Sequence, residues 1–565
     1  MALQCAWSVT SHGKGQPVES AHDALPEEGN RKGERPNVVI ILADDLGFSD
    51  VGSYGSEIPT PAIDRLAASG QRFSQMYNSG RCCPSRAALL TGMNPHQAGI
   101  GHMTYTPPIG NAAYQGYLSD SCATIAELFQ EAGYRTLMSG KWHVARQRSL
   151  ADRKNWPDDR PAHPLPRERG FDEFYGTIGG GGSYFKPTFL MDGDSMIEQQ
   201  DPSWFYTDAI SDRAVEMASR SMAQRNPFFL YVAYTAPHWP LHAPDEDIAR
   251  FDGSYRTGWD EVRASRHDEL KANGILDPKW KLSGRDNEAW PWNETRFTDW
   301  EAHRMAVYAA QIHQMDRGIG RILDTIESGG QLDNTLVLFL SDNGGCAEFL
   351  AEDGGILDVE PGTFARTTPS GQPVHFGNTP ELRPGGPTTF QSYGPCWANA
   401  SNSPFRNFKR WVHEGGISTP FIIHWPARIP EPGITHTPAH IIDILPTCLE
   451  AAGIPYPSEY KGQALSPLEG QSLVPILDDP NRTRPGAIFF EHEGNRALRV
   501  DEWKLVSGEG GPWELYNITE DRTETNDLAS SELQRVEAMA AAWHASASRM
   551  HVSLTLRDDL ADLLA

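Results

Sequence analysis

The sequence is short of cysteine, of long apolar runs and of positive charge. Its 565 residues include only seven cysteines, an odd number spread from Cys5 to Cys448. That pattern excludes the disulfide framework of a small secreted domain. No stretch approaches the ~20 apolar residues that a membrane-spanning helix requires. We therefore expect a globular chain with no membrane partner.

The shortage of positive charge limits the ligands that the chain can attract. Lysine and arginine number 49 against 74 aspartates and glutamates, which gives a formal net charge of −25. A field of this sign repels nucleic acids and acidic membranes, so we expect no nucleic-acid partner. It also repels anionic substrates at long range. Any anion site must therefore be a local pocket of positive charge.

The first 35 residues carry no clear targeting signal. Their only apolar stretch, Ala2 to Val9, is interrupted by Gln4 and Ser8 and has no basic start, unlike a secretory signal peptide. The rest is polar and charged, which predicts a flexible tail over residues 1–35. These features favour a cytoplasmic location over a periplasmic or secreted one, but they leave the compartment open.

Buried strands alternate with amphipathic helices over most of the chain. Residues 38–43 form an apolar, β-branched run with no polar face, which is typical of a central strand in a parallel sheet. Similar runs occur at 228–234 and 335–340, and helical periodicity is clear at 122–132 and 301–327. The alternation predicts an α/β fold with a doubly wound, mixed but mostly parallel sheet flanked by helices.

The character of the sequence changes near residue 485. Beyond it, short strand candidates separated by turns precede a helix that starts at Ser531, which predicts a small antiparallel sheet with a terminal helix. We therefore expect a catalytic domain at 36–484 and a C-terminal α+β subdomain at 485–565. Residues 345–405 are rich in glycine, proline and threonine, and are predicted to form a long irregular loop or lid.

Polar side chains follow three of the predicted strands. Asp44 and Asp45 end the first, His238 follows the second, and Asp342 and Asn343 end the third. Open α/β sheets bind ligands beyond the carboxyl ends of their strands, so one shared pocket is expected. An acidic pair alone is more often a turn or a helix cap. Together, the two acidic residues of the first strand end and Asp342 and Asn343 of the third supply oxygen ligands and no sulfur or nitrogen ligands, which suits a hard cation such as Ca²⁺ or Mg²⁺.

A second constellation lies at residues 81–92, Arg-Cys-Cys-Pro-Ser-Arg-Ala-Ala-Leu-Leu-Thr-Gly. Pro84 favours a helix start, so Cys82 is expected at a helix N-terminus, where free N–H groups attract anions. Arg86 lies one turn further on. Adjacent cysteines can also be buried small apolar residues or metal thiolates, but the four spaced ligands of a thiolate site are absent.

This segment resembles the signature of the type I sulfatases of the alkaline phosphatase superfamily, and linking stretches look nearest to bacterial arylsulfatases. The signature is Cys-x-Pro-Ser-Arg followed by a hydrophobic pair and Thr-Gly. The resemblance implies that a maturation enzyme oxidises Cys82 to formylglycine, which hydrates to a geminal diol. The x position is Cys83 rather than a hydroxyl-bearing residue or alanine, a small departure from the signature that leaves the role of Cys83 open.

The resemblance extends to further segments of the chain. Residues 41–50 and 341–344 are similar to the two metal-binding segments of the family, which implies one Ca²⁺ held by Asp44, Asp45, Asp342, Asn343 and the modified Cys82. Gly-Lys-Trp-His at 140–143 implies that Lys141 and His143 contact diol and sulfate. Residues 236–241 place His238 on the sulfate or leaving oxygen. Lys409 takes the last basic position, although Arg406 or Arg410 could substitute for it.

The implied reaction is hydrolysis of an aryl or carbohydrate sulfate to an alcohol or phenol and inorganic sulfate. Arg86 would hold and neutralise the diol, and Asp342 would take the proton from its attacking hydroxyl, while Ca²⁺, Lys141 and Lys409 offset the charge on the transferring sulfuryl group. His238, alone or with Lys409, would protonate the leaving oxygen, and His143 would deprotonate the second hydroxyl. Two alternatives stay open: a phosphate or phosphonate monoester hydrolase on the same fold, and an unmodified pseudoenzyme that binds sulfated glycans. Loop aromatics could stack on the substrate, namely Tyr184, Phe185, Trp204, Phe205, Trp290, Trp292 and Trp397.

Overall fold

A computed structural model describes residues 35–105, 109–351, 362–429 and 431–556. All of them belong to one compact unit that begins at Arg35. The predicted tail, apart from Arg35, lies outside the described residues, as does the end of the C-terminal subdomain after residue 556. Among the described helices, every one is too short or too polar to traverse a lipid bilayer.

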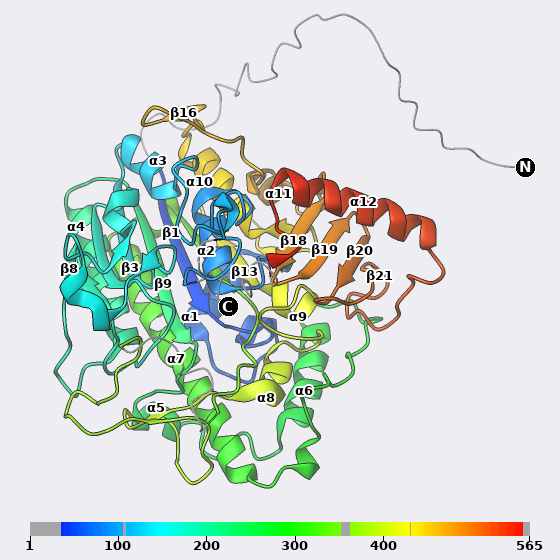
Figure 1. The fold of residues 1–565 in the computed structure, drawn as a ribbon, viewed down its shortest axis with the longest axis horizontal. Coiled ribbons are helices and arrows are strands. Elements are labelled where there is room, and N and C mark those ends of the chain that lie inside the picture. Colours follow the sequence, from blue (N-terminus) through cyan, green and yellow to red (C-terminus); the bar gives the residue numbers. More distant parts are fainter. Residues whose placement is uncertain (1–34, 106–108, 352–361, 430, 557–565) are drawn as a thin grey trace, which may run out of the picture. The chain divides into compact units, whose positions relative to one another are not determined.

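A central sheet of eleven strands, counted within the described residues, organises the chain (Figure 1). β1 (Asn37–Asp44) lies between β10 (Thr335–Ser341) and β9 (Phe228–Pro237) and is parallel to both, and β3 (Arg135–Gly140) continues the parallel set beyond β9. β13 (Ser418–His424) runs antiparallel to β10. The predicted mixed, mostly parallel sheet is confirmed. Its remaining strands are β2 (Gln71–Tyr77), β6 (Glu173–Thr177), β7 (Leu190–Asp192), β8 (Ser195–Met196), β14 (Gly433–Thr435) and β15 (Ala439–His440).

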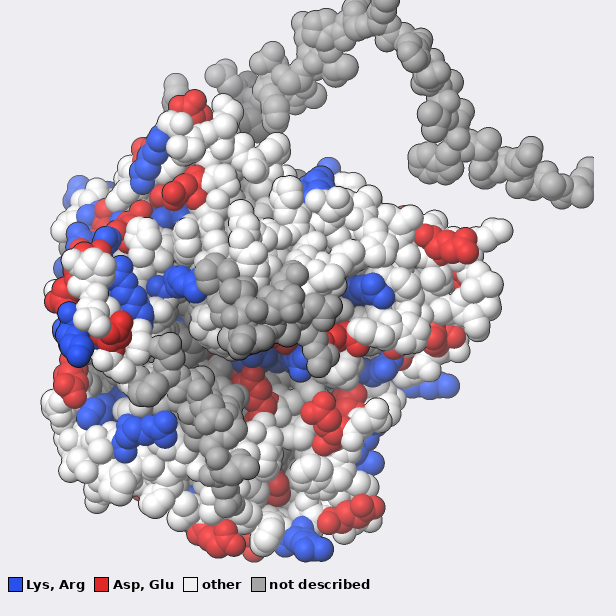
Figure 2. Space-filling model, in the orientation of Figure 1, with Lys and Arg blue, Asp and Glu red and all other residues white. Residues whose placement is uncertain are grey.

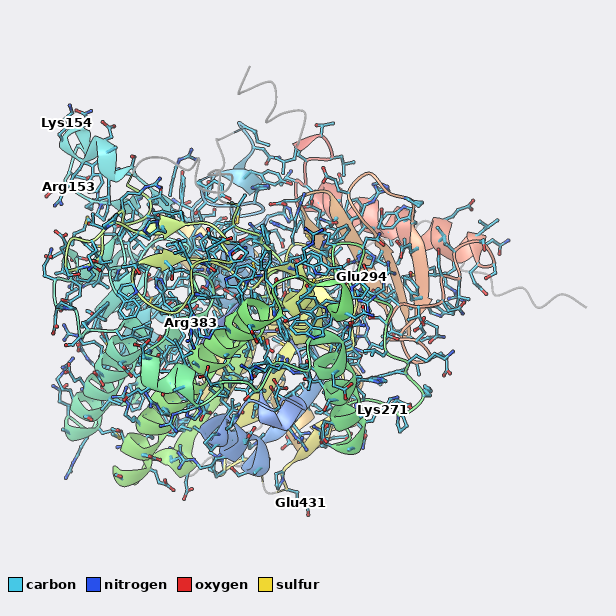
Figure 3. The ribbon with its side chains drawn as sticks, turned by 90° about the horizontal axis from the view of Figure 1, so that it is seen from below. Arg153, Lys154, Lys271, Glu294, Arg383 and Glu431 are labelled. Carbon is cyan, nitrogen blue, oxygen red and sulfur yellow. The ribbon has the colours of Figure 1, made fainter. Side chains whose placement is uncertain are left out.

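Helices cover both faces of the sheet. Alternate residues of β1 pack into two separate cores, with Val39 and Ile41 on one side and Val38 and Ile40 on the other, as the two-residue period of a strand requires. The first core includes α1 (Pro61–Ser69), α4 (Tyr206–Ala223) and α7 (Thr298–Ser328); the second includes α2 (Cys82–Thr91), α3 (Ile125–Glu131) and α10 (Ile444–Ala452). Charged side chains such as Arg153, Lys154 and Lys271 project outward from the ribbon (Figure 3).

Helix α3 begins three residues later than the pattern at 122–132 predicts. Thr124 Oγ1 accepts a hydrogen bond from Glu127 N at 3.1 Å, and the Glu127 carboxylate accepts one from Thr124 N at 2.9 Å. This reciprocal capping box fixes the helix start. Cys122 therefore lies outside the helix, although its side chain is buried.

The prediction of an irregular segment over 345–405 is wrong for its last part. Residues Gly394–Ser401 form helix α8, and β11 (His375–Phe376) pairs with β12 (Thr389–Phe390). Every residue of α8 is buried, so the helix has no solvent-exposed face. Its sequence therefore lacks the alternation of polar and apolar residues by which a helix is recognised. Trp397 is fully buried and its indole donates to Glu301 O at 2.9 Å. Residues 352–361 of this segment lie outside the described part.

The chain after residue 485 forms the expected antiparallel sheet and helix. Four strands follow in order, β18 (Ile488–His492), β19 (Asn495–Val500), β20 (Trp503–Ser507) and β21 (Glu514–Asn517), and α12 (Leu533–Arg549) packs on one face through Trp543. The other face packs against Tyr77 of β2 and Val412. The boundary at residue 485 stays a prediction, because the two parts share this buried interface.

Four charged side chains are buried where the two sheets meet. Lys504 of β20 lies 2.9 Å from Glu414 and 2.8 Å from Glu524, and Arg522 Nε donates to Glu414 at 3.0 Å. All four are fully or almost fully buried. Glu414 opens α9 (Glu414–Ile417), which leads directly into β13 of the central sheet. The network therefore ties the C-terminal sheet to the central one.

Replacing Lys504 with methionine should destabilise the protein by about 3–5 kcal/mol, because it leaves Glu414 and Glu524 buried without their shared cation. The free energy of unfolding, measured in urea, checks this. Lys279→Met is the matched control, since Lys279 forms an exposed pair with Glu520 at 3.1 Å, and it should change the unfolding midpoint little. A loss of stability at Lys504 no larger than at Lys279 would contradict the expectation.

Candidate active site

The four parallel strands bring the predicted residues to one edge of the sheet. β10 ends before Asp342 and Asn343, β1 ends at Asp44, β9 ends before His238, and β3 ends before Lys141. All of the predicted site residues are buried, with at most 5% of their surface exposed. The β3–β9 contact requires glycine at position 140, where a Cβ would lie 1.9 Å from Ala233 O. The sheet thus assembles the pocket that the strand ends predict.

Cys82 reaches this pocket from helix α2. The helix begins at Cys82, two residues earlier than Pro84 suggests, and Arg81 is its N-cap. The whole helix is buried, and Gly92 ends it in a left-handed conformation with φ 65°. The sulfurs of Cys82 and Cys83 and a ring nitrogen of His143 all lie within 4.8 Å of one another. Cys82 is therefore held at a helix N-terminus beside a histidine.

Oxygen atoms converge where β1 and β10 end. Asn343 Nδ2 donates to Asp45 Oδ1 at 2.7 Å, and Asp45 N donates to Asp342 Oδ1 at 3.3 Å. Asp44 Oδ1 and Asn343 Oδ1 are buried and have no hydrogen-bond partner among the described residues. Unpartnered buried oxygens are costly and call for a ligand. Oxygen donors without sulfur fit a hard cation, and Asp44 and Asp45 also share a cluster with His238.

Three cations surround these carboxylates. Arg86 Nε donates to Asp342 Oδ2 at 2.9 Å, and Arg86 Nη2 lies 3.6 Å from Asp44 Oδ2. Lys141 Nζ donates to Asp44 Oδ2 at 2.6 Å. Lys409 Nζ lies 2.9 Å from Asp45. Arg86, expected to neutralise the diol, thus also holds Asp342 and Asp44 in place.

Two of the carboxyl groups resist ionisation in this environment. Burial and the neighbouring Asp44 together raise the pKa of Asp342 to about 8, against the opposing effect of Arg86 and Lys141. Burial likewise raises the pKa of Asp44 to about 6. Burial acts in the same direction on Asp45, but His238 and Lys409 outweigh it and lower the pKa of that carboxyl. A divalent cation would stabilise all three carboxylates.

Two histidines face the pocket from the neighbouring strands. His238 Nδ1 bonds to Trp239 O at 2.7 Å, so Nδ1 carries the hydrogen and Nε2 faces Lys409 Nζ at 3.4 Å. His143 follows β3 in a left-handed conformation with φ 54°, which is strained for a non-glycine residue. Burial lowers the pKa of each imidazole to about 4. Both rings are therefore neutral near pH 7 and able to accept a proton.

Arg81 and Glu348 lie at the rim of this pocket and were not among the residues selected from the sequence. Glu348 Oε1 lies 2.9 Å from Arg81 Nη2, and Glu348 Oε2 accepts from the Trp239 indole at 2.7 Å. Burial alone would raise the pKa of Glu348, but Lys409, Arg81 and His238 lower it to about 2. The available signal was that Arg81 directly precedes Cys82 and that Glu348 follows Asn343 by five residues.

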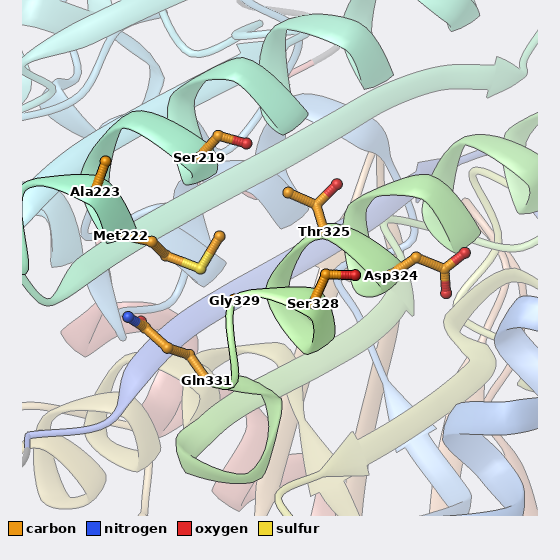
Figure 4. A pocket seen from close by; sticks show the side chains of 8 residues that line it. All are labelled: Ser219, Met222, Ala223, Asp324, Thr325, Ser328, Gly329 and Gln331. Atoms are coloured by element: carbon orange, nitrogen blue, oxygen red, sulfur yellow. The ribbon is translucent and has the colours of Figure 1, made fainter.

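Other hollows lack this chemistry. A depression of about 630 Å³ at the C-terminal ends of α4 and α7 is lined by one carboxylate, Asp324, and otherwise by uncharged residues (Figure 4). It lies next to the start of β10, at the opposite end of that strand from Asp342. Among the aromatics proposed to stack on a substrate, Tyr184, Phe205 and Trp397 are buried in the core. They pack the protein and are closed to a ligand.

The visible surface carries no broad basic region. Acidic and basic side chains are interspersed over the face shown in Figure 2, in keeping with the net charge of −25. Three cations, Arg86, Lys141 and Lys409, are instead buried around Cys82. Positive charge is thus concentrated locally, as the composition requires.

Comparison with protein families gives two matches. A model described as Sulfatase matches residues 36–454. A second, described as N-sulphoglucosamine sulphohydrolase, C-terminal, matches residues 405–546. The first spans the whole central sheet and every predicted site residue, and the second spans the C-terminal sheet and most of α12.

Individual proteins are similar over nearly the full chain. The chain is 32% identical over 527 residues to PB10D8.02c of Schizosaccharomyces pombe, an uncharacterized sulfatase, covering 88% of this chain and 90% of that protein. It is 34% identical over 466 residues to an arylsulfatase of Klebsiella aerogenes, covering 80% and 94%.

Solved structures share the fold. Ps i-CgsB, crystallised with k-i-k-neocarrahexaose, superposes with a TM-score of 0.60 at 26% identity, covering 91% of this chain and 92% of that one. The PsFucS1 sulfatase from Pseudoalteromonas sp. superposes with a TM-score of 0.58 at 19% identity, covering 92% and 91%.

Proposed function

The chain belongs to the sulfatase family and is a sulfuric ester hydrolase, and from this premise we propose that it acts through a formylglycine made from Cys82 and one bound Ca²⁺. The resemblance read from residues 81–92 is thereby confirmed at the level of the family. The observation that carries the proposal is the convergence of Cys82, three buried cations and an oxygen-lined cluster at one sheet edge.

The proposed substrate is an aryl sulfate or a carbohydrate sulfate. The arylsulfatase of Klebsiella aerogenes supports the first class, and the oligosaccharide in the Ps i-CgsB crystals supports the second. Arg86, Lys141 and Lys409 would offset the negative charge of the transferring sulfuryl group in a site shielded from water. Lys141 follows β3, Arg86 lies in α2, and Lys409 lies between α8 and α9. All three contact carboxylates at the strand ends.

The position of Cys82 fits its proposed oxidation by a maturation enzyme. It lies at the first helical residue, beside His143 and facing Lys141. Formylglycine supplies, as its hydrate, two hydroxyls on one carbon. Asp342 would take a proton from the first of them, and the neutral His143 would take a proton from the second. His143 is held for this by the strained backbone after β3.

The oxygen cluster fits Ca²⁺. Asp44, Asp45, Asp342 and Asn343 would hold it, and the buried, unpartnered Asp44 Oδ1 and Asn343 Oδ1 support this choice. The ion supplies Lewis acidity toward sulfate oxygens. Lys409 and His238, 3.4 Å apart, would share the proton that the leaving oxygen needs.

Turnover of 4-nitrophenyl sulfate and 4-nitrophenyl phosphate by one preparation tests the proposal. We expect kcat/KM for the sulfate to exceed that for the phosphate by at least about tenfold, a difference of roughly 1.4 kcal/mol in transition-state stabilisation. Preference for the phosphate would favour a phosphomonoester hydrolase. Binding of sulfated glycans without turnover of either ester would favour a pseudoenzyme.

A further inference from the structure

A second cavity lies beside the candidate active site, between loops of the central sheet and the C-terminal subdomain. Its volume is about 580 Å³. Apolar residues of α12 and the segment after it close one side, and charged residues of the β18–β19 turn and nearby loops line the other. The residues that the argument uses are His102, Arg410, Glu493, Arg496, Glu509 and Trp543.

Two residues that line the cavity are directly connected to the active site: Arg410 through the chain and His102 through a contact with the Cys83 side chain. Arg410 directly follows Lys409, whose Nζ contacts Asp45, and Arg410 N donates to Gly80 O at 2.7 Å. The carbonyl of His102 accepts from Cys83 Sγ at 3.8 Å. Successive Cα atoms are ~3.8 Å apart. A substrate with its sulfate at Cys82 can therefore extend from the rim into this cavity.

The carboxylates that face the cavity already have partners. Glu493 lies 2.6 Å from Arg410 and 3.5 Å from His102. Glu509 lies 3.3 Å from Arg410. Glu491 lies 2.7 Å from His96 and accepts from Gly494 N at 2.9 Å. Glu493 and Glu509 therefore share the cation Arg410, and Glu491 is held by His96.

Arg496 differs from Arg410, the other arginine of the cavity, in its contacts. Its guanidinium lies 4.2 Å from the Trp513 ring centroid and 5.8 Å from that of Trp543. Within the described ranges it has no ion-pair partner, and its Nε is buried without a hydrogen bond. The aromatic rings fix its orientation. An orientated, unpaired guanidinium is suited to bind a sulfate or carboxylate through two parallel hydrogen bonds.

We propose that this cavity binds a second anionic group of a sulfated oligosaccharide, a sulfate or a uronate carboxylate on a sugar next to the one that is desulfated, and that Arg496 is the residue that holds it. Val552, which is partly exposed, and Leu554, which is exposed, follow α12 and pack against the sugar ring. The proposal rests on the sulfatase function and narrows the substrate to an oligosaccharide with more than one negative charge.

The test uses Arg496→Ala with Arg535→Ala as matched control. Arg535 also stacks on a tryptophan of the C-terminal sheet, 4.0 Å from the Trp503 ring, but it is outside the cavity and pairs with Glu532. The substrates are 4-nitrophenyl sulfate and three sulfated tetrasaccharides: one with a second sulfate, one with a uronate, and one with neither. Only the first two tetrasaccharides offer the second charge, and comparing them distinguishes sulfate from carboxylate.

Arg496→Ala should lower kcat/KM roughly 10- to 100-fold for a tetrasaccharide with the second charge, the range for a lost charge-assisted hydrogen bond. It should leave 4-nitrophenyl sulfate and the singly charged tetrasaccharide within about twofold of wild type. Arg496→Lys should recover part of the loss, because the charge remains while the fork is lost. Arg535→Ala should leave all four rates unchanged.

An equal fall on all four substrates would make Arg496 merely structural and overturn the proposal. So would an unchanged rate on the doubly charged tetrasaccharides, or a wild type that prefers the singly charged one. If no ester is hydrolysed, the sulfatase function itself has failed. Calorimetric binding of the doubly charged tetrasaccharides to wild type and Arg496→Ala then tests the cavity separately: tighter binding by wild type supports it, and equal binding overturns it.

Discussion

Cys82→Ala is expected to lower sulfate ester hydrolysis by a factor on the order of 10⁴ to 10⁶, the usual effect of removing a nucleophile. The substitution removes the only atom from which formylglycine can be made. It should leave the fold intact, because Cys82 begins α2 and its backbone keeps the same helical position. Rates with 4-nitrophenyl sulfate, together with circular dichroism, separate lost chemistry from lost structure.

Cys83→Ala is the matched control. Its sulfur is also buried, but it contacts Met103 Sδ at 3.4 Å and the His102 carbonyl at 3.8 Å. We expect most of the activity to remain, with a modest loss of stability from the missing sulfur contact. If Cys83→Ala is inactive while Cys82→Ala is active, the motif has been placed one residue out of register.

Asp342→Asn is expected to remove bound calcium and to lower kcat by a factor on the order of 10³ or more. The carboxylate is a proposed ion ligand and the proposed base, and a lost general base alone costs roughly 10²- to 10⁴-fold. The amide keeps the size of the side chain but loses the ion pair with Arg86 at 2.8 Å. Metal analysis of the purified variant and its rate with excess Ca²⁺ check the result, and added Ca²⁺ should not restore activity.

Asp50→Asn provides the control for a buried aspartate near the same strand. Asp50 pairs with Arg266 at 2.5 Å and accepts from Tyr308 at 2.8 Å, outside the oxygen cluster. The variant should lose stability but keep its calcium. Zinc at full occupancy in the wild type, or calcium lost equally from both variants, would contradict the assigned ligands.

The strand ends made much of the site predictable. A run without a polar face reveals a central strand, and the residue after it must lie at the sheet edge, so Asp44, Asp342 and His238 could be grouped from the sequence. The contacts of Arg86 with Asp44 and Asp342 could not be predicted. Asp44 ends β1 and Asp342 follows β10, and Asp342 is 256 residues from Arg86 in the sequence. Only the assembled sheet determines that spacing.

Lys409 illustrates the same limit. The sequence does not distinguish Lys409 from its neighbours Arg406 and Arg410. In the structure the three side chains point in different directions. Lys409 contacts Asp45, Arg406 contacts Glu514, and Arg410 contacts Glu493. Helix α8 was missed for another reason, because a helix buried on every side has no amphipathic period. Both depend on tertiary packing rather than on local pattern.

The most direct test of the account is the mass of the peptide that contains Cys82, taken from protein with measured sulfatase activity. Oxidation to formylglycine makes the residue about 18 Da lighter than cysteine. We expect the lighter peptide, with a modified fraction that rises in proportion to specific activity among preparations. Fully active protein in which Cys82 is an unmodified cysteine would contradict the account.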